Sequence, residues 1–429
     1  PEETGKPGVR ARAVNSGHDR KVYGTSPVAA SAAEDPPHAR HDAGRKPRFN
    51  TMPMLDVTLD QPKLLDALKT AATVCDRKSN NQPILANVLL RGDKAGLSFA
   101  ATDMQVSSTE TIAPAVDMTL AQRGTACAPV RTLLQIVSGL PSKPVRLRAL
   151  ENHWIEVTSG RINMKLMGQS AADFPELPEP KKTALVAVAA TSVAEMIDKT
   201  KASISTDEAR VNLNGVLFES TGKRMTMVST DGHRLTKFSA DFAGPKFERG
   251  VIIPRRAVLA LVSMLTRAKS GQVELGVDAQ HLFARSAGLT LALKLNNVVF
   301  PPYEQVIPKE VKRTATLDRV EFTRSLSRAV VMAPEKTATV TLTFTSKAKT
   351  LYLKADNPDL GVVTDELDME WSGEGGELLT GYNATYILEA LASITSDKVS
   401  LSLQGVLDPM TIRPVDGPDF LAVVMPMRV

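Results

Sequence analysis

The chain has 429 residues, of which 43% are hydrophobic and 23% charged, so it has the composition of a globular protein with room for two to four domains. Aromatic residues make up only 4%, which argues against a wide platform for stacking bases, and the net charge is +5. Two cysteines are too few for a disulfide framework or a cysteine-rich metal site, and no apolar run reaches the roughly 20 residues that span a bilayer. We therefore expect a cytoplasmic protein without a cofactor.

Residues 1–51 carry nine of the 52 basic residues and six of the 47 acidic ones, and they are rich in proline, glycine, alanine and arginine. This segment has almost no Leu, Ile or Phe and no periodicity, so it cannot bury enough apolar surface to offset the entropy cost of ordering. We predict a disordered leader or tag. A basic arm that touches DNA and a misassigned start are alternatives that the sequence leaves open.

From residue 52 onward, a weak pattern occurs three times. Each copy opens with apolar residues at helical spacing, in residues 64–75, 193–204 and 322–330. A hairpin-like pair of strands follows, with Asp103, Asp231 and Asp356 at the turns, and these aspartates are 128 and 125 residues apart. A second helix is then predicted to begin near Pro129, Pro254 and residues 381–384, because proline suits the first turn of a helix.

Alternating strands close each copy, at residues 145–148, 289–295 and 399–403, and proline-rich linkers follow the first two copies, at residues 173–178 and 300–308. This repeat is too long for a solenoid and indicates three whole domains of one α+β fold. We place the domains at residues 52–178, 179–305 and 306–429. Three similar domains in a row give the chain two different ends, and two copies joined head to tail can then close a ring.

The search for catalytic and metal-binding motifs finds no phosphate-binding loop, no His-Glu-x-x-His, no nucleophile elbow and no Cys/His ligand cluster, so we expect neither an enzyme nor a metal site. The most distinctive segment runs from Val228 to Leu235. Asp231-Gly232 in this segment is typical of a β-hairpin turn. A hydrolase that uses Asp231 and His233 as an acid–base pair is the alternative, but it lacks a third catalytic group.

The C-terminal segment, residues 420–429, is apolar almost to its end. It predicts a closing strand, and Pro426 indicates that the last residues leave the ladder, because proline cannot donate its hydrogen bond. Met425 and Met427 beside valine and leucine would make an adaptable apolar wall for a peptide groove.

Basic residues recur at the predicted helices of all three copies. Any one of them is typical of a solvated helix face, but their recurrence predicts one shared surface that contacts DNA phosphates without reading the sequence. The candidates are Arg131, Lys199, Lys201, Arg255, Arg256, Arg324 and Arg328.

Five motifs in a fixed order are similar to those of one protein family. They are Ala172 through Pro175, Leu213 through Glu219, Thr230 through Leu235, Gly381 through Asn383, and Val424 through Arg428. Over residues 54–429 the chain therefore resembles the bacterial DNA polymerase III β subunits, the sliding clamps.

The resemblance implies a head-to-tail homodimer of three-domain subunits, in which helices line a channel around duplex DNA and the sheets lie outside. Such a protein is not an enzyme. It encircles DNA and tethers the replicative polymerase, the clamp loader and repair proteins through their short linear peptides, which confers processivity, and it does not involve a membrane. A monomeric peptide-binding adaptor that does not encircle DNA is a further alternative.

The resemblance also implies a peptide-binding cleft between the second and third domains. Carried over by motif, its residues are Leu213, Thr230, Gly232, His233, Arg234, Leu235, Pro301, Gln305, Val306, Leu407, Pro409, Val423, Val424, Met425, Pro426, Met427 and Arg428.

Three features depart from the family pattern or match it only in part. Gln305 replaces a common arginine and Pro409 a small hydroxyl residue, so we expect the rim of the cleft to prefer different peptides. The basic loop with Arg77 and Lys78 is a further candidate DNA contact, although it has no clear motif.

Overall fold

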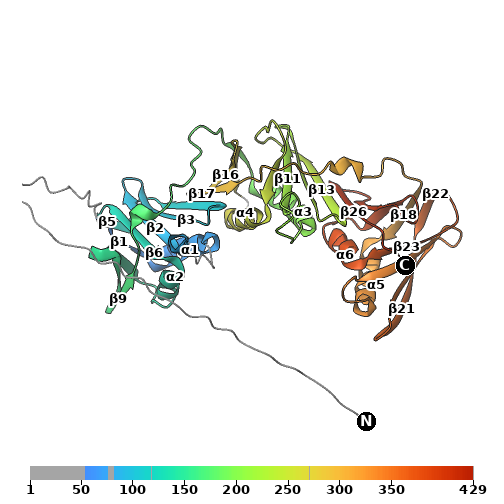
Figure 1. Cartoon of the computed structure of the whole chain (residues 1–429), viewed down its shortest axis with the longest axis horizontal. Helices are drawn as coiled ribbons and strands as arrows, with labels where there is room; N and C mark the ends of the chain where they lie inside the picture. The colour runs from blue at the N-terminus through green and yellow to red at the C-terminus, as the bar shows by residue number, and fades with distance from the viewer. Residues whose placement is uncertain (1–53, 76–81, 117, 270, 429) are drawn as a thin grey trace, which may run out of the picture. The chain divides into compact units, whose positions relative to one another are not determined.

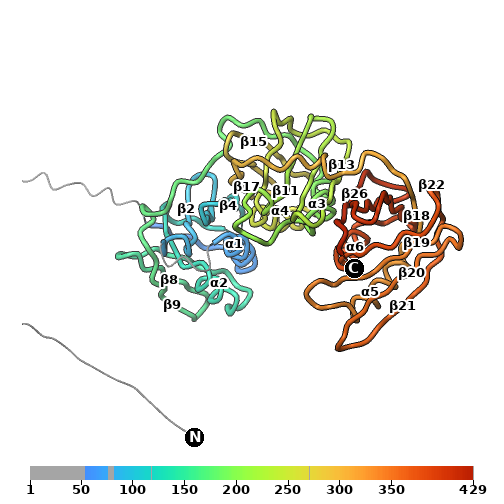
Figure 2. The backbone as a smooth tube through the Cα atoms, turned by 45° about the vertical axis from the view of Figure 1, so that its right-hand side comes forward, coloured from blue at the N-terminus to red at the C-terminus, as the bar shows by residue number. Residues whose placement is uncertain are grey.

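The computed structural model describes residues 54–75, 82–116, 118–269 and 271–428. Within them the chain passes through three successive groups of strands and helices, which Figure 2 colours from blue to red. Each group contains two helices that pack against each other, namely α1 with α2, α3 with α4, and α5 with α6 (Figure 1). The groups follow the predicted threefold repeat and have the predicted α+β composition.

The first group has helices α1 (Gln61–Val74) and α2 (Val130–Ser138). Its strands are β1 (Asp56–Asp60), β2 (Asn87–Asp93), β3 (Gly96–Thr102), β4 (Val106–Ile112), β5 (Met118–Gln122), β6 (Gly124–Pro129), β7 (Pro144–Ala149), β8 (Trp154–Ser159) and β9 (Ile162–Met167). Strands β5-β1-β7-β8-β9 form a five-stranded sheet, whereas β4-β3-β2-β6 belong to a larger one.

The second group has helices α3 (Ala190–Thr200) and α4 (Arg255–Ala268). Its strands are β10 (Val186–Ala189), β11 (Gly215–Ser220), β12 (Arg224–Thr230), β13 (Arg234–Asp241), β14 (Val251–Pro254), β15 (Gln272–Val277), β16 (His281–Ser286) and β17 (Leu289–Lys294).

The third group has helices α5 (Arg319–Met332) and α6 (Ala384–Ala392). Its strands are β18 (Arg313–Asp318), β19 (Thr339–Thr345), β20 (Thr350–Asn357), β21 (Gly361–Asp368), β22 (Glu370–Gly373), β23 (Glu377–Asn383), β24 (Lys398–Leu403), β25 (Met410–Pro414) and β26 (Asp419–Val424). Strands β21-β20-β19-β23 form a four-stranded sheet.

Two sheets cross the junctions between groups. At the first junction β17 pairs with β4, with Leu291 opposite Ser108, and this gives the eight-stranded sheet β10-β15-β16-β17-β4-β3-β2-β6. At the second junction β26 pairs with β13, with Ala422 opposite Thr236, and this gives the nine-stranded sheet β14-β11-β12-β13-β26-β25-β24-β18-β22. Backbone hydrogen bonds therefore join neighbouring domains in addition to the linkers.

Helices α2 and α4 begin directly after Pro129 and Pro254, which are their N-cap residues, and α6 begins at Ala384, close to the predicted positions. Helices α1, α3 and α5 each begin three residues before the segments predicted for them. Pro62 lies in the first turn of α1, and Asp318 accepts a hydrogen bond from the N–H of Glu321 at 2.8 Å before α5. One apolar face of each first helix is buried, as its periodicity predicts, through Leu64, Leu68, Val193, Met196, Phe322 and Leu326.

Two elements of the predicted repeat are misplaced. Asp356 lies inside β20, and the turn to β21 begins at Asn357, whose Oδ1 accepts the N–H of Asp359 at 2.9 Å. The predicted strand at 289–295 is β17, which corresponds to β9 and β26 rather than to β7. The second-domain counterpart of β7 is β15, in which the buried Val273 and Leu275 alternate with Gln272 and Glu274, a pattern that was not singled out in the sequence.

Candidate partner cleft and nucleic-acid surface

The turn between β12 and β13 is built by the side chain of Asp231. Its Oδ1 accepts the N–H groups of His233 at 2.9 Å and Arg234 at 3.1 Å, and Gly232 has a φ of 92°, a left-handed conformation that disfavours a side chain. The predicted hairpin turn is thus confirmed. The same hydrogen bonds occupy the carboxylate of Asp231, which the hydrolase hypothesis assigned to catalysis.

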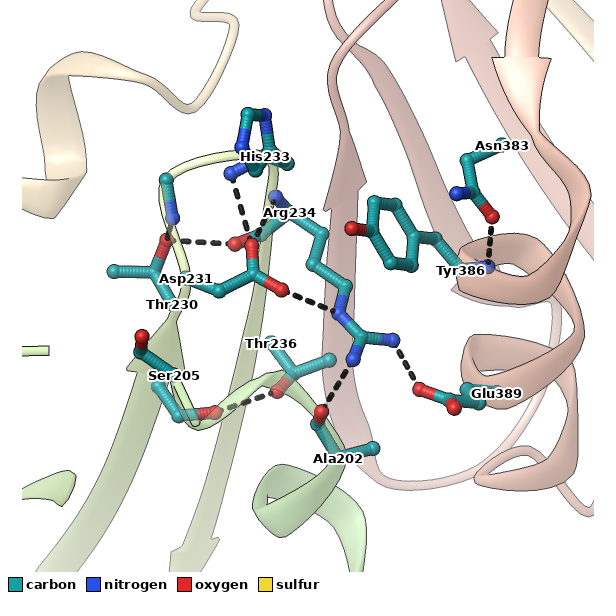
Figure 3. A network of polar contacts seen from close by, with 12 residues as sticks. Ala202, Ser205, Thr230, Asp231, His233, Arg234, Thr236, Asn383, Tyr386 and Glu389 are labelled. Carbon is teal, nitrogen blue, oxygen red and sulfur yellow. Dashed lines mark hydrogen bonds and ion pairs between the residues drawn. The ribbon is translucent and has the colours of Figure 1, made fainter. Parts of the chain in front are cut away.

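Arg234 joins this turn to the third domain (Figure 3). Its Nε donates to Asp231 Oδ2 at 3.0 Å and its Nη2 donates to the carbonyl of Ala202 at 2.5 Å. The guanidinium also forms an ion pair with Glu389 of α6 and lies over the ring of Tyr386, 4.3 Å from its centroid. Because the side chain is only 12% exposed, these contacts replace the hydration of a buried charge.

Sequence reasoning missed Tyr386 and Glu389. Glu389 is 155 residues from Arg234, so no local pattern connects them. The one available signal is their i, i+3 spacing, which places an aromatic ring and a carboxylate on the same face of α6.

The space around Arg234 is nearly filled. The cavity that it lines with Leu235, Val424 and Tyr386 has a volume of about 10 Å³, enough for one water at most. Val424 is 1% exposed. Arg234 of β13 lies opposite Val424 of β26. We therefore place both residues beneath the candidate cleft rather than on its open surface.

A separate apolar cluster lies on the same pair of strands. Leu235 and Val423 are opposite each other on β13 and β26, and Phe300 and Tyr303 of the linker pack over them. All four side chains are at least nine-tenths buried. The linker thus covers this part of the sheet face.

Exposed apolar side chains occur at three of the remaining candidate positions, since Val306, Leu407 and Met425 are 43%, 69% and 36% exposed. The other candidates are either exposed or partly covered, except for Leu213, which is 9% exposed. Exposed candidates are Gly232, His233, Gln305 and Arg428, and partly covered ones are Thr230, Pro301, Pro409, Pro426 and Met427.

Hydrogen bonds and strand pairing bring several candidates to the same place. The loop that contains Leu213 reaches the turn through Arg210, whose Nη1 donates to the carbonyl of Asp231 at 3.2 Å. Pro409 precedes Met410, which lies opposite Val424 in the ladder.

The C-terminal residues connect the second and third domains. Strand β26 ends at Val424, as Pro426 predicted, and the N–H of Met425 donates to the carbonyl of His233 at 3.0 Å. The N–H of Met427 donates to the carbonyl of Gly381 at 2.8 Å. The tail therefore borders the Asp231 turn at one end and β23 at the other.

The basic candidates differ in what they contact. Arg255 and Arg324 are exposed. Lys201 forms an ion pair with Asp198 at 2.5 Å, Arg328 forms one with Asp365, and Arg131 reaches the carbonyl of Ala72 at 3.5 Å. The Arg328 guanidinium holds the pKa of Asp365 below its ordinary value, as expected for a hydrogen-bonded pair.

Two basic candidates are committed to the fold. Lys199 is 8% exposed, and its Nζ donates to the carbonyl of Ser393 in the third domain, so the prediction of a DNA contact there is wrong. Arg256 forms an ion pair with Asp103 and donates to the carbonyl of Val74 at 3.1 Å, so it ties the second domain to the first. Arg77 and Lys78 lie outside the described residues.

Replacing Lys199 by Met should lower the thermal stability of the protein. The change leaves the buried carbonyl of Ser393 without its charged donor, which we expect to cost about 1–3 kcal/mol. Lys201→Met, two residues away on the surface, is the matched control and should change stability by less than about 0.5 kcal/mol. Differential scanning calorimetry measures both, and equal melting temperatures for the two variants would contradict the assignment.

Among residues 54–428, as far as the structure describes them, no three His, Cys, Asp or Glu side chains group to hold a metal ion. None of the described helices is long and apolar enough to cross a membrane.

Three tandem domains of one α+β fold, with paired helices and sheets that continue across the junctions, define the class of DNA clamps. Three consecutive segments match the family descriptions of the DNA polymerase III beta subunit: its N-terminal domain over residues 55–178, its central domain over 187–302 and its C-terminal domain over 304–428. The chain therefore belongs to the DNA polymerase III beta subunit family.

Curated relatives agree with this assignment. The beta sliding clamp of Pseudomonas aeruginosa is 30% identical over 372 residues, which cover 86% of this chain and 99% of the relative. The beta sliding clamp of Caulobacter vibrioides is 30% identical over 385 residues, or 87% of this chain and 100% of the relative. The crystal structure of the P. aeruginosa subunit superposes with a TM-score of 0.81 at 29% identity and covers 87% of this chain and 100% of that one.

The protein is accordingly a sliding clamp for DNA polymerase III and not an enzyme. The hydrolase and monomeric-adaptor hypotheses receive no support.

Proposed function

We propose that two copies of this chain close a ring around duplex DNA in the bacterial cytoplasm and tether the polymerase and other proteins through short peptides. The observation that carries this proposal is a pair of sheet edges, at opposite ends of the repeat, that pair with no further strand among the described residues. Strand β9 ends the five-stranded sheet of the first domain, and β21 ends the four-stranded sheet of the third. Both carry exposed apolar side chains, among them Ile162, Met164, Met167 and Val362.

The two internal junctions indicate how these edges would pair. In each, the last strand of one domain (β17 or β26) joins the strand after the hairpin turn of the preceding domain (β4 or β13). The same rule applied to the ends of the chain joins β9 of one copy to β21 of another. An unprotected apolar edge is a liability in a monomer, and this pairing removes it at both ends.

The register follows from the same comparison. Leu291 and Ala422 occupy equivalent places in β17 and β26, where they lie opposite Ser108 and Thr236. In the adjoining strands, Leu291 lies opposite Ala284 and Ala422 lies opposite Ile412. The equivalent position in the first domain is Val157, and its partner in β9 is Met164. Met164 is therefore the residue of β9 that corresponds to Leu291 and Ala422. The equivalent residue of β21 is Val363. We therefore expect Met164 of one copy to face Val363 of the other.

Solution mass tests the ring directly. The chain has a mass of 46.2 kDa, so light scattering should give a dimer of twice that value at micromolar concentration. A monomer would remove the ring from the proposal while leaving the peptide cleft untouched.

The helices would supply the surface that faces DNA. Arg255 at the start of α4, Lys201 after α3 and Arg324 in α5 are exposed and remain the candidates for phosphate contacts. Enclosure by a ring means that each contact can be weak, so the clamp slides while it stays on the DNA. Arg131 is equivalent to Arg256, so we assign it to the junction between copies rather than to the DNA.

Replacing Arg255 by Glu should weaken binding to a short linear duplex several-fold at low salt. It should also make the affinity for DNA less dependent on salt concentration, because one phosphate contact is lost. The exposed position leaves the fold intact. Arg256 is unsuitable for this test because its ion pair with Asp103 holds two domains together. Fluorescence anisotropy over a salt series measures the effect, and Arg249→Glu, an exposed arginine outside the helices, is the control. Equal salt dependence for Arg255→Glu and the parent would exclude the proposed surface.

The peptide cleft would lie along the edge of the apolar cluster at the second junction. Val306 and Met425 offer exposed apolar surface beside the buried pair Leu235 and Val423. An extended peptide from the polymerase, the clamp loader or a repair protein could bury one or two apolar anchors there, and the polar rim around His233 and Gln305 would set its direction.

A further inference from the structure

A hollow of about 310 Å³ lies at the first junction, between the sheet and the linker of residues 171–181. This volume is in the range of small ligand pockets. Its floor is a row of three residues on adjacent strands, Leu89, Ala100 and Thr109, and the linker contributes Phe174 and Leu177. None of these residues belongs to the candidate cleft.

The second junction contains the same site in a filled form. Its row on β11, β12 and β13 is Leu217, Val228 and Lys237, each 128 residues after its counterpart in the first junction. The ring of Tyr303 packs on this row and is only 7% exposed. Its hydroxyl donates to Glu219 Oε2 at 3.1 Å, and its ring centroid is 5.8 Å from the Lys237 ammonium.

Sequence differences explain why the first site is hollow. The linkers run Phe174-Pro175-Glu176-Leu177 and Phe300-Pro301-Pro302-Tyr303, so a leucine stands where the second linker has the tyrosine. On the floor, Ala100 and Thr109 are smaller than the valine and lysine of the second site. The hollow thus has the place and the surroundings of an aromatic side chain that this linker does not provide.

The polar end of the site carries opposite charges at the two junctions. Arg91 lies opposite Ser98, as Glu219 lies opposite Thr226, so a guanidinium replaces the carboxylate that accepts the tyrosine hydroxyl. Arg91 is exposed and has no ion pair with any described residue, whereas Lys181 at the rim is paired with Glu179 at 3.4 Å. Beside Arg91 an occupant would offer an acceptor or an anion instead of a donor, whereas the linker side of the hollow also carries the carboxylates of Glu176 and Glu179.

We propose that this hollow is a second docking site, which binds the aromatic side chain of an extended partner peptide while Arg91 binds a carboxylate next to it. The sheet row and Phe174 would bury the ring in the way that the second junction buries Tyr303. The comparison of the two junctions therefore predicts the sequence of the peptide, which is a tyrosine or phenylalanine flanked by acidic residues.

The test uses an acetylated, amidated pentapeptide, Gly-Asp-Tyr-Asp-Gly, titrated into the full chain and followed by NMR of the peptide. We expect saturable binding to the parent. Leu177→Tyr should fill the hollow from within and weaken binding at least tenfold, and it should raise the melting temperature. Arg91→Glu should weaken binding of the acidic peptide and favour the same peptide with lysine in place of aspartate.

Matched controls separate this site from the candidate cleft. A peptide with alanine in place of tyrosine should not bind, and deletion of residues 425–429 should leave binding unchanged. Tyr303→Leu should create a second hollow that takes an aromatic peptide with lysine flanks, because Glu219 faces it. Should Leu177→Tyr lack a cooperative unfolding transition, Ala100→Leu fills the same space from the floor. Failure of the parent to bind the acidic peptide, or equal affinity for the parent and the filled variant, overturns the proposal.

Discussion

Replacing Met164 by Asp is expected to convert the dimer into monomers. The proposed pairing places this side chain against Val363 of the second copy, where a carboxylate loses its hydration without gaining a partner. We expect a cost of about 3 kcal/mol at each of the two interfaces of a ring, which weakens the dimer by roughly four orders of magnitude. Sedimentation velocity measures the change, and retention on circular DNA should disappear with it.

Two further variants test the register and the head-to-tail arrangement. Thr119→Asp places the same charge on β5, the opposite edge of the same sheet, and should leave the dimer intact. Val363→Lys alone should also give monomers. An equimolar mixture of Met164→Asp and Val363→Lys should dimerise again, because one interface then pairs the two introduced charges and the other is of the parent type. Failure of the mixture to associate, with both variants folded, would contradict the proposed register.

Local patterns were enough to predict the threefold repeat. Apolar residues at helical spacing identified the first helices, whose buried faces include Leu64 and Phe322, and Asp231-Gly232 identified a hairpin turn. These features depend on residues that are close in sequence, so periodicity and turn residues are enough to predict them. The domain boundaries and the residues of the cleft remain predictions.

Contacts between domains were not predictable in this way. Lys199 and Lys201 look alike in the sequence, yet one is buried against Ser393 and the other is paired on the surface with Asp198. Lys199 lies in the last turn of α3, where it reaches a carbonyl of the third domain, whereas Lys201 lies after the end of that helix. Arg234 was included in the cleft by motif, but its actual contacts with α6 depend on a packing between residues far apart in the chain.

Deleting residues 425–429 should abolish binding of a peptide that contains glutamine and leucine and is typical of clamp partners. The parent is expected to bind it with micromolar affinity, because apolar burial of roughly 25 cal/mol per Å² is partly offset by the entropy that a flexible peptide loses. The deletion removes the exposed Met425 and the contacts of Met427 with Gly381. The dimer and its ring should persist, because β26 itself ends at Val424.

Met425→Asp is the sharper version of this experiment. It keeps the backbone hydrogen bond from residue 425 to His233 and the contact of Met427, so the junction stays closed while the apolar wall gains a charge. Burying an anchor side chain beside that carboxylate costs several kcal/mol, so affinity should fall at least tenfold. Asp416→Ala, an exposed change in the loop before β26, is the control and should bind as the parent does. Calorimetric titration of the peptide into each form measures the result. Equal affinities for Met425→Asp and the parent would place the partner cleft elsewhere on the clamp and leave the ring proposal standing, because the two surfaces share no residue.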